Sequence, residues 1–270
     1  MPIAIPAAVH TPHPNDKYQN VSTAVTNLPV IDFDGFEDGN GPRAQEIAEQ
    51  FYAACRDVGF AYIRNFGMDL ELVDEMFGWS KKFFDLSKEV KLKAPHPAAG
   101  WHHRGYSAVG RSIAVQLMKQ LWQHSRSYEY GNKEHTRLTN ILIPDEDLPG
   151  YNAALERYFQ AGTACSKVLL KALALAMPGV PAGFLEEYHA WGDNQVRLLH
   201  YPPQSTTALR NGEVGRIGEH TDYGSGTILF QDGTGGLEVE DPNKPGTFLQ
   251  AKPIPGYAVF NIGEYIPTNF

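Results

Sequence analysis

Two side chains with metal-binding chemistry stand two residues apart late in the chain. His220 and Asp222 belong to the segment Gly218-Glu-His-Thr-Asp-Tyr-Gly224. Residues two apart on a β-strand point to the same side, so this imidazole and this carboxylate can reach one ion. Two histidines and one carboxylate on one face suit Fe(II) and leave positions open for O2 and an organic co-substrate. The pair can supply two of these three ligands.

A His-x-Asp pattern is weak evidence by itself, because short patterns arise by chance. The same residues also fit a surface turn in which the Asp222 carboxylate accepts a hydrogen bond from His220. The elements around the motif must therefore decide between a metal site and a turn.

The chain before the motif predicts helices separated by short strands. Apolar residues recur at helical spacing after Pro42 as far as Val58, and again from Tyr151 to Met177, which is the longest predicted helix. Asp69 can cap a further helix. The remaining predictions are short strands over Leu28–Asp32 and Phe60–Ile63 and loops over Pro95–Tyr130.

After Asp193 the pattern changes to short β-rich runs separated by Gly, Pro, Asn and Asp turns. This rhythm is typical of a sandwich or a barrel. The sequence therefore predicts an α+β fold in which helices pack outside a β-barrel of jelly-roll type. The predicted strands are Val196–Tyr201, Thr227–Gln231, Leu237–Glu240, Thr247–Gln250 and Tyr257–Ile262.

Composition limits the class of partner. The chain has 270 residues, of which 42% are hydrophobic, and this is enough to bury a sizeable core. Its formal net charge is −8, and Lys and Arg are scattered along the chain. These features argue against nucleic acid or a membrane as the main partner and favour a small-molecule substrate. No pattern predicts an oligomeric state.

The N-terminal residues 1–27 contain no basic segment followed by a long apolar run. We therefore expect neither a signal peptide nor a spanning helix, and we interpret these residues as a mobile arm. The two cysteines, Cys55 and Cys165, each lie in a helical pattern. Two buried thiols in a reducing compartment are expected, which predicts a cytoplasmic protein.

Four ordered blocks surround and extend the His-x-Asp motif: Arg197–Pro203, His220–Asp232, Gly235–Val239 and Pro255–Gly263. Together they closely resemble the catalytic part of the isopenicillin N synthase-like family of Fe(II)- and 2-oxoglutarate-dependent dioxygenases, especially its fungal members. The resemblance extends from Leu28 to Gly263, because three earlier segments are similar to the leading domain of that family. These are Leu28–Asp32, Cys55–Phe60 and Phe83–Glu89.

The resemblance implies a double-stranded β-helix (jelly-roll) core with flanking helices. It implies an oxygenase that uses Fe(II), 2-oxoglutarate and O2 to oxidise a C–H bond of a small molecule, in secondary metabolite biosynthesis. Hydroxylation, desaturation and ring closure all stay open. The expected organisation is a flexible arm (1–27), an N-terminal non-haem dioxygenase domain (28–135), a helical connection (136–191) and the Fe(II)/2-oxoglutarate core (192–270).

Carried over residue by residue, the resemblance implies that His220 and Asp222 bind Fe(II) and that the Tyr201 hydroxyl contacts 2-oxoglutarate. Arg197 points to the same face as Tyr201 if both lie on one strand, so it can meet the acidic co-substrate or the substrate. A surface ion pair is the alternative for Arg197. Leu199 stands where the family often has asparagine, which removes one expected hydrogen bond.

Basic and aromatic residues gather in one loop, at His102, His103, Arg104, Tyr106 and Arg111. The stretch resembles the substrate-side loop of fungal family members. His103, Arg104 and Tyr106 are therefore predicted to bind the substrate, as such groups can hold an oxygenated aromatic or a carboxylate. A loop that serves only packing is the alternative.

The same resemblance places a third ligand, a histidine, on a later strand, followed by an Arg-x-Ser that pairs with the distal carboxylate of 2-oxoglutarate. The 48 residues after Asp222 contain no histidine and no Arg-x-Ser. We therefore expect an incomplete iron site and a jelly roll whose last core strands are missing. The alternative to an oxygenase is a catalytically inactive truncated paralogue or splice product that acts as a non-catalytic binding protein.

Overall fold

The computed structural model describes residues 27–37, 39–97, 103–108, 125–134, 137–205, 207–208 and 220–266. These residues form two compact units. Unit 1 contains 27–68, 165–190 and 220–266, and unit 2 contains the described residues of 69–164 and 191–208. No helix within the described ranges is long and apolar enough to cross a membrane.

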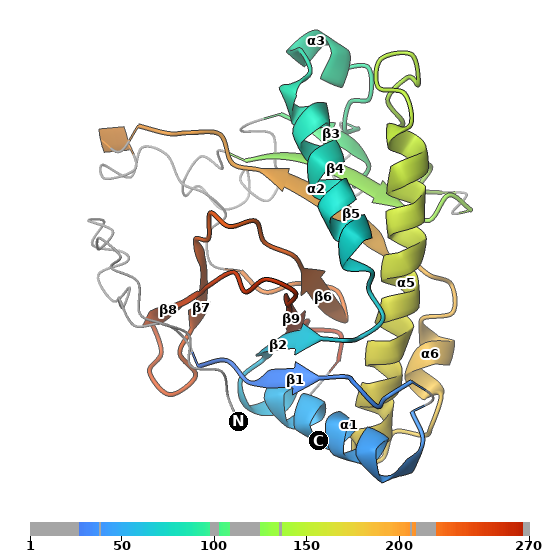
Figure 1. Ribbon diagram of the computed structural model, residues 1–270, viewed down its shortest axis with the longest axis vertical. Helices are drawn as coiled ribbons and strands as arrows, with labels where there is room; N and C mark the ends of the chain where they lie inside the picture. The colour runs from blue at the N-terminus through green and yellow to red at the C-terminus, as the bar shows by residue number, and fades with distance from the viewer. Residues whose placement is uncertain are drawn as a thin grey trace. The chain divides into compact units, whose positions relative to one another are not determined.

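Unit 1 is built on a four-stranded sheet whose members come from distant parts of the chain. Its order is β1 (Val30–Asp32), β2 (Phe60–Arg64), β9 (Ala258–Ile262) and β6 (Gly226–Leu229). β1 and β2 are parallel, and α1 (Gly41–Asp57) makes the crossover that a parallel pair needs. α1 lies beside β1 and β2 (Figure 1), and β9 runs antiparallel to both of its neighbours.

Side chains of the central strands β2 and β9 alternate between the two faces of this sheet, and both faces are packed. Ala61 and Ile63 of β2 pack into the core formed with α1, while Tyr62 between them packs on the opposite face. β9 repeats the pattern, with Phe260 on the α1 side and Val259 on the other. The α1 side also receives the second half of α5 (Tyr151–Ala176) and α6 (Phe184–Tyr188), and the other side receives the hairpin of β7 (Leu237–Glu240) and β8 (Phe248–Ala251).

Unit 2 holds a three-stranded antiparallel sheet in the order β3 (Gly105–Ser107), β4 (Arg126–Gly131) and β5 (Gln195–His200). One face carries Tyr106, Tyr128, Tyr130 and Leu198, which pack with residues of α2 (Leu70–Asp85) and the first half of α5. The short helix α3 (Lys88–Lys91) follows α2. Asp69 caps α2 as predicted, because its side chain accepts a hydrogen bond from the Glu71 amide.

The prediction of loops over Pro95–Tyr130 was wrong for two segments, because β3 and most of β4 lie there. Both strands are short and rich in Gly, Ser, Arg and Glu, so their local pattern is poor. Their pairing depends on tyrosines that meet across the sheet, as in the opposed pair Tyr106 and Tyr128. The long helix and the five later strands are confirmed, with ends within two residues of the prediction.

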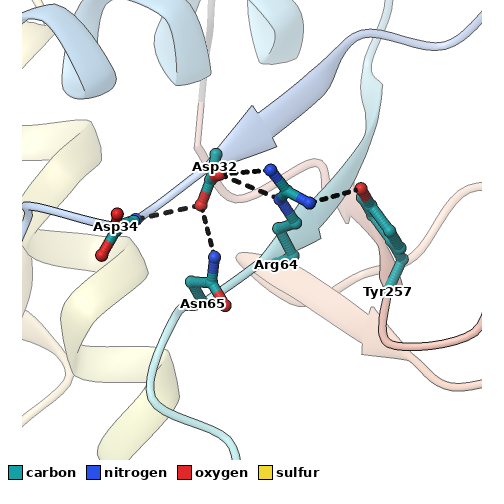
Figure 2. Close-up of polar contacts among 5 residues, drawn as sticks. All are labelled: Asp32, Asp34, Arg64, Asn65 and Tyr257. Carbon is teal, nitrogen blue, oxygen red and sulfur yellow. Dashed lines mark hydrogen bonds and ion pairs between the residues drawn. The ribbon is translucent and has the colours of Figure 1, made fainter. Parts of the chain in front are cut away.

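A polar cluster joins three segments of unit 1, and we call it the Asp32 cluster: Asp32, Asp34, Arg64, Asn65 and Tyr257 (Figure 2). Asp32 Oδ2 accepts from Arg64 Nε and Nη2 at 2.9 and 2.6 Å. Asp32 Oδ1 accepts from the Asp34 amide at 3.1 Å and from Asn65 Nδ2 at 2.7 Å. Arg64 Nη1 donates to the Tyr257 hydroxyl at 3.0 Å. Both oxygens of this carboxylate are therefore occupied.

Candidate active site

The His-x-Asp motif lies in unit 1, on the segment that leads into β6. Because His220 to Asp222 do not form a strand, the alternation of strand side chains that predicted a shared face does not apply to them. The side chains nevertheless approach each other, with His220 Nε2 3.4 Å from Asp222 Oδ1. The His220 side chain is 54% exposed and the Asp222 side chain 30%. The predicted pair is thus brought together near the surface of unit 1.

One oxygen of Asp222 is held by two residues that sequence reasoning missed. Thr227 Oγ1 donates to Oδ2 at 2.6 Å, and Asn261 Nδ2 donates to the same oxygen at 2.8 Å. Thr227 on β6 stands directly opposite Asn261 on β9, so a cross-strand pair grips the carboxylate. Hydrogen bonds from His220, Thr227 and Asn261 outweigh partial burial and hold the pKa of Asp222 well below its usual range. The carboxylate therefore stays ionised, with Oδ1 toward His220.

The backbone around Asp222 is fixed by the segment that follows β9. The Glu264 amide donates to the Asp222 carbonyl at 3.0 Å, and the Gly263 amide donates to the Ser225 carbonyl at 3.1 Å. A Cβ atom on Gly263 would lie 1.9 Å from the Gly224 carbonyl oxygen, which no side chain can tolerate. Position 263 therefore needs glycine so that these two backbone segments can touch.

His189, at the end of α6, also holds the segment that follows Asp222. Its Nδ1 lies 2.6 Å from the Leu185 carbonyl oxygen, and its Nε2 lies 2.6 Å from Ser225 Oγ. A carbonyl can only accept a hydrogen bond, so Nδ1 carries the proton and Nε2 accepts from the Ser225 hydroxyl when the ring is neutral. This ring therefore anchors the turn between Asp222 and β6.

The two donors fit neighbouring positions on one metal ion. Two ligands bound at about 2.1 Å and at right angles lie about 3 Å apart, close to the separation of His220 Nε2 and Asp222 Oδ1. An imidazole nitrogen with a carboxylate oxygen suits Fe(II). Among the residues that the structure describes, no group of three or more His, Cys, Asp or Glu side chains is placed to hold an ion. The pair thus fits as two ligands of a centre that needs a further donor.

Arg197 and Tyr201 both belong to unit 2. Arg197 is on β5, and Tyr201 follows the last residue of that strand and is partly buried. Arg197 Nε lies 3.2 Å from Oε1 of Glu129, the residue directly opposite on β4. The Arg197 side chain is 46% exposed, whereas Glu129 is only 2% exposed. The ion pair that sequence reasoning allowed for Arg197 is present, but its acidic partner is buried and had not been identified.

The loop residues predicted to bind substrate lie in and before β3. Tyr106 is buried in the core of unit 2, in edge contact with Phe83. Arg104 is also buried, and its Nη1 donates to the His103 carbonyl at 2.7 Å. Burial lowers the pKa of His103, so its ring favours the neutral form. His102 and Arg111 lie outside the described residues.

Two family descriptions match this chain. The N-terminal family of a non-haem dioxygenase in morphine synthesis matches residues 28–146, and the 2OG-Fe(II) oxygenase superfamily matches residues 192–269. A 2-oxoglutarate-dependent dioxygenase, frbA, of Dothideomycetidae sp. (strain 11243) is 35% identical over 248 residues, which are 88% of this chain and 73% of that protein. The proline hydroxylase buaE of Petromyces alliaceus is 34% identical over 221 residues, which are 81% of this chain and 69% of buaE.

Among solved structures, the chain resembles a full-length Neurospora crassa protein that was crystallised in complex with alpha-KG and thymine. The TM-score is 0.78 at 34% sequence identity, covering 88% of this chain and 74% of the Neurospora crassa protein. The chain therefore spans about three quarters of the length of that protein and of frbA. The fold of these proteins is that of the jelly-roll oxygenases, in agreement with the predicted fold class.

Proposed function

Because this chain belongs to the 2OG-Fe(II) oxygenase superfamily, we propose that His220 and Asp222 are ligands of its Fe(II) and that it oxidises a C–H bond of a small molecule. The chain is a 2-oxoglutarate-dependent dioxygenase, with Fe(II) and 2-oxoglutarate as cofactors. The relatives favour this function over a non-catalytic binding protein.

The assignment of His220 and Asp222 as ligands is carried by one observation: the two carboxylate oxygens of Asp222 make different contacts. Thr227 and Asn261 occupy Oδ2, which leaves Oδ1 free to face His220 Nε2 and a metal. Such outer contacts orient a ligand and hold it ionised before the metal arrives. When bound, Fe(II) with 2-oxoglutarate supplies the O2 activation that C–H oxidation needs.

The other predicted residues are assigned by chemistry. Tyr201 offers a hydroxyl donor to 2-oxoglutarate, and Arg197 offers a planar guanidinium that suits a carboxylate of 2-oxoglutarate or a polar group of the substrate. His103, Arg104 and Tyr106 are proposed for the substrate side. A small-molecule substrate is supported by the Neurospora crassa protein, which is solved with thymine, and by buaE, which is named a proline hydroxylase. We also propose a role in secondary metabolism and a cytoplasmic location.

Two protein ligands hold Fe(II) more weakly than three. We therefore propose that this chain, in which the described residues bring only His220 and Asp222 together as candidate ligands, binds Fe(II) weakly, and that a polypeptide with a further histidine donor binds it tightly. Anaerobic titration with Fe(II) and 2-oxoglutarate tests this, because a complete chelate gives a visible charge-transfer band. We expect no band for the 270-residue chain. A band that disappears in Asp222→Ala would contradict the incomplete site and would support the assignment of Asp222.

Succinate formation from 2-oxoglutarate tests the oxygenase function itself. We expect turnover that depends on Fe(II) and falls in both His220→Ala and Asp222→Ala, measured on a polypeptide that supplies the further donor. The matched control is Asp232→Ala, because Asp232 is an exposed carboxylate of unit 1 that accepts a hydrogen bond from the Thr234 amide within a turn. If turnover persists in both variants, His220 and Asp222 are not ligands of the iron.

A further inference from the structure

The sheet of unit 2 has one polar face with buried charge. Its other face carries the tyrosines of the core. On the polar side, Ser127, Glu129 and Gly131 of β4 alternate with those tyrosines, and Glu129 pairs with Arg197 of β5. We call Arg104, Glu129 and Arg197 the Glu129 cluster. Glu129 and Arg104 are each 2% exposed. Charged residues are rarely buried so fully unless they are paired.

Among the described residues, only one of the two carboxylate oxygens of Glu129 has a partner. Its Oε1 is 3.2 Å from Arg197 Nε, but its Oε2 is buried and has no hydrogen-bond partner in the part of the chain that the structure describes. A buried carboxylate oxygen without a partner is costly, because it has lost its water and gained nothing in return. The position therefore calls for a donor that the described residues do not supply.

Among the described residues, Arg104 has hydrogen-bond donors without partners, whereas Glu129 has an acceptor without one. Nη1 of Arg104 donates to the His103 carbonyl, while its Nε and Nη2 are buried and without a partner among the described residues. The guanidinium packs against Gly131, where a Cβ atom would lie 2.0 Å from Nη2. Glycine thus leaves the space that this buried guanidinium fills. Glu129 and Gly131 are two residues apart on β4 and lie on the same face of the sheet, so the guanidinium that packs against Gly131 lies on the face that carries Glu129. The negative charges of Asp193 and Glu129 both act on Arg104 there.

The open positions specify a ligand with two adjacent functions. The Nε and Nη2 edge of Arg104 needs an oxygen acceptor, and Oε2 of Glu129 needs a donor. 2-Oxoglutarate carries acceptors only, so it would leave Glu129 unsatisfied and bring a further negative charge beside it. Arg197 is the exposed member of the cluster, so a molecule that arrives from solvent meets its guanidinium first.

We propose that the Glu129 cluster binds the substrate of this enzyme, and that the substrate is a small molecule with an N–H donor beside an oxygen acceptor. Two sources share that chemistry: the ammonium and carboxylate of an α-amino acid, and the N–H and C=O of a cyclic amide or imide. Glu129 receives the N–H, and Arg104 binds the oxygen. The inference rests on the proposed oxygenase function and names the class of its substrate.

The experiment measures binding of a panel of α-amino acids and pyrimidine bases to the full chain in the presence of 2-oxoglutarate, by calorimetry without O2. We expect at least one compound to bind, and Glu129→Gln to weaken it about tenfold or more, because a charge-assisted hydrogen bond is lost. An analogue in which CH2 replaces the N–H should bind the unaltered protein as weakly as the parent binds Glu129→Gln. Binding by amino acids or by bases then identifies the source.

The matched control is Glu75→Gln, which removes an exposed carboxylate of the same unit that is bonded to Trp79 and Arg157. This variant should bind the ligand unchanged. If Glu129→Gln does not fold, Arg104→Lys replaces it, since lysine keeps the charge but lacks the planar edge. Absence of any ligand from the panel, or equal affinity in the altered and control variants, would overturn the proposal. Absence of 2-oxoglutarate turnover in a polypeptide that supplies the further iron donor would instead count against the oxygenase function.

Discussion

The Asp32 cluster and the Glu129 cluster both place a carboxylate against an arginine from another strand, yet they differ in what they leave open. Asp32 accepts four hydrogen bonds, and its side chain keeps 29% exposure. Glu129 is almost fully buried, and among the described residues its carboxylate has one partner, Arg197. A satisfied cluster at the surface holds segments together. A buried cluster with unused donors and acceptors is suited to receive a molecule.

Asp222 stands between these extremes, with one oxygen gripped by Thr227 and Asn261 and the other turned to His220. This half-open arrangement is what a metal ligand requires. We therefore expect that removing a closed contact, in which every donor and acceptor has a partner, changes stability. Removing an open contact, in which some of them have none, should change binding.

The largest effect is expected for Asp222→Ala. Loss of an outer contact to a ligand lowers metal affinity by about 10- to 100-fold, so loss of the ligand itself should lower Fe(II) affinity by at least about a hundredfold. Competition with a coloured Fe(II) chelator measures this in a polypeptide that supplies the further donor, because this chain is expected to bind Fe(II) weakly. Asp232→Ala serves as the control and should keep the affinity of unaltered protein. An Asp222→Ala protein with undiminished affinity would place the metal elsewhere.

Asn261→Ala should have the next largest effect. It removes the hydrogen bond that orients Asp222 from β9 but leaves both proposed ligands, so we expect Fe(II) affinity to fall by about tenfold, within the range for outer contacts. Asn261→Asp is the informative partner variant, because it keeps the shape but puts a second negative charge beside Asp222. If the alanine variant loses only thermal stability, Asn261 is structural and does not act through the metal site.

Asp32→Asn should act on stability alone. It replaces a charge that accepts from Arg64, Asn65 and the Asp34 amide, so the free energy of unfolding should fall by about 1–3 kcal/mol. Urea unfolding gives the change, and Fe(II) and 2-oxoglutarate affinity should stay the same. A variant that folds as well as unaltered protein but binds Fe(II) less tightly would reverse the roles assigned to closed and open clusters.

The pH dependence of stability gives a smaller and more specific effect. Burial raises the pKa of Asp32, but hydrogen bonds from Asn65, the Asp34 amide and Arg64 outweigh it, so the folded pKa lies below that of the unfolded chain. The stabilisation is therefore present above the unfolded value and is lost as pH falls through the folded one. Unfolding measured from neutral pH down to about pH 3 should show a shallower loss in Asp32→Asn than in unaltered protein. Parallel curves would contradict this.

The smallest effect concerns the thiols. Cys55 and Cys165 are free and buried, as predicted from the sequence, and burial raises their pKa values to about 12 and about 11. Because the thiolate is the reactive form, both should react with a thiol reagent only after unfolding. Fast labelling of native protein would show that α1 or α5 opens locally.

Sequence reasoning found the parts of the site that are local in the chain. His220 and Asp222 form one short motif, and Asp69, the long helix and the later strands follow local patterns. Thr227 and Asn261 were missed because their role depends on the register between β6 and β9, although each lies in a block that resembles the family. The role of Glu129 is not visible in the sequence, because the pattern over β4 predicts a loop and the pairing with Arg197 appears only in the sheet. The domain limits at 27, 135 and 191 stay predictions.

The strand order of unit 1 has a consequence for synthesis of the chain on the ribosome. β9 lies between β2 and β6, and Tyr62 pairs with Val259. Because a chain is synthesised at about 5–20 residues per second, β2 leaves the ribosome roughly 10–40 s before β9 does. During this time one edge of β2 and its apolar side chains are uncovered. Contacts between such distant residues also form slowly. We expect the yield of folded protein to rise when translation is slowed or chaperones are supplied, because the waiting edge is open to other chains.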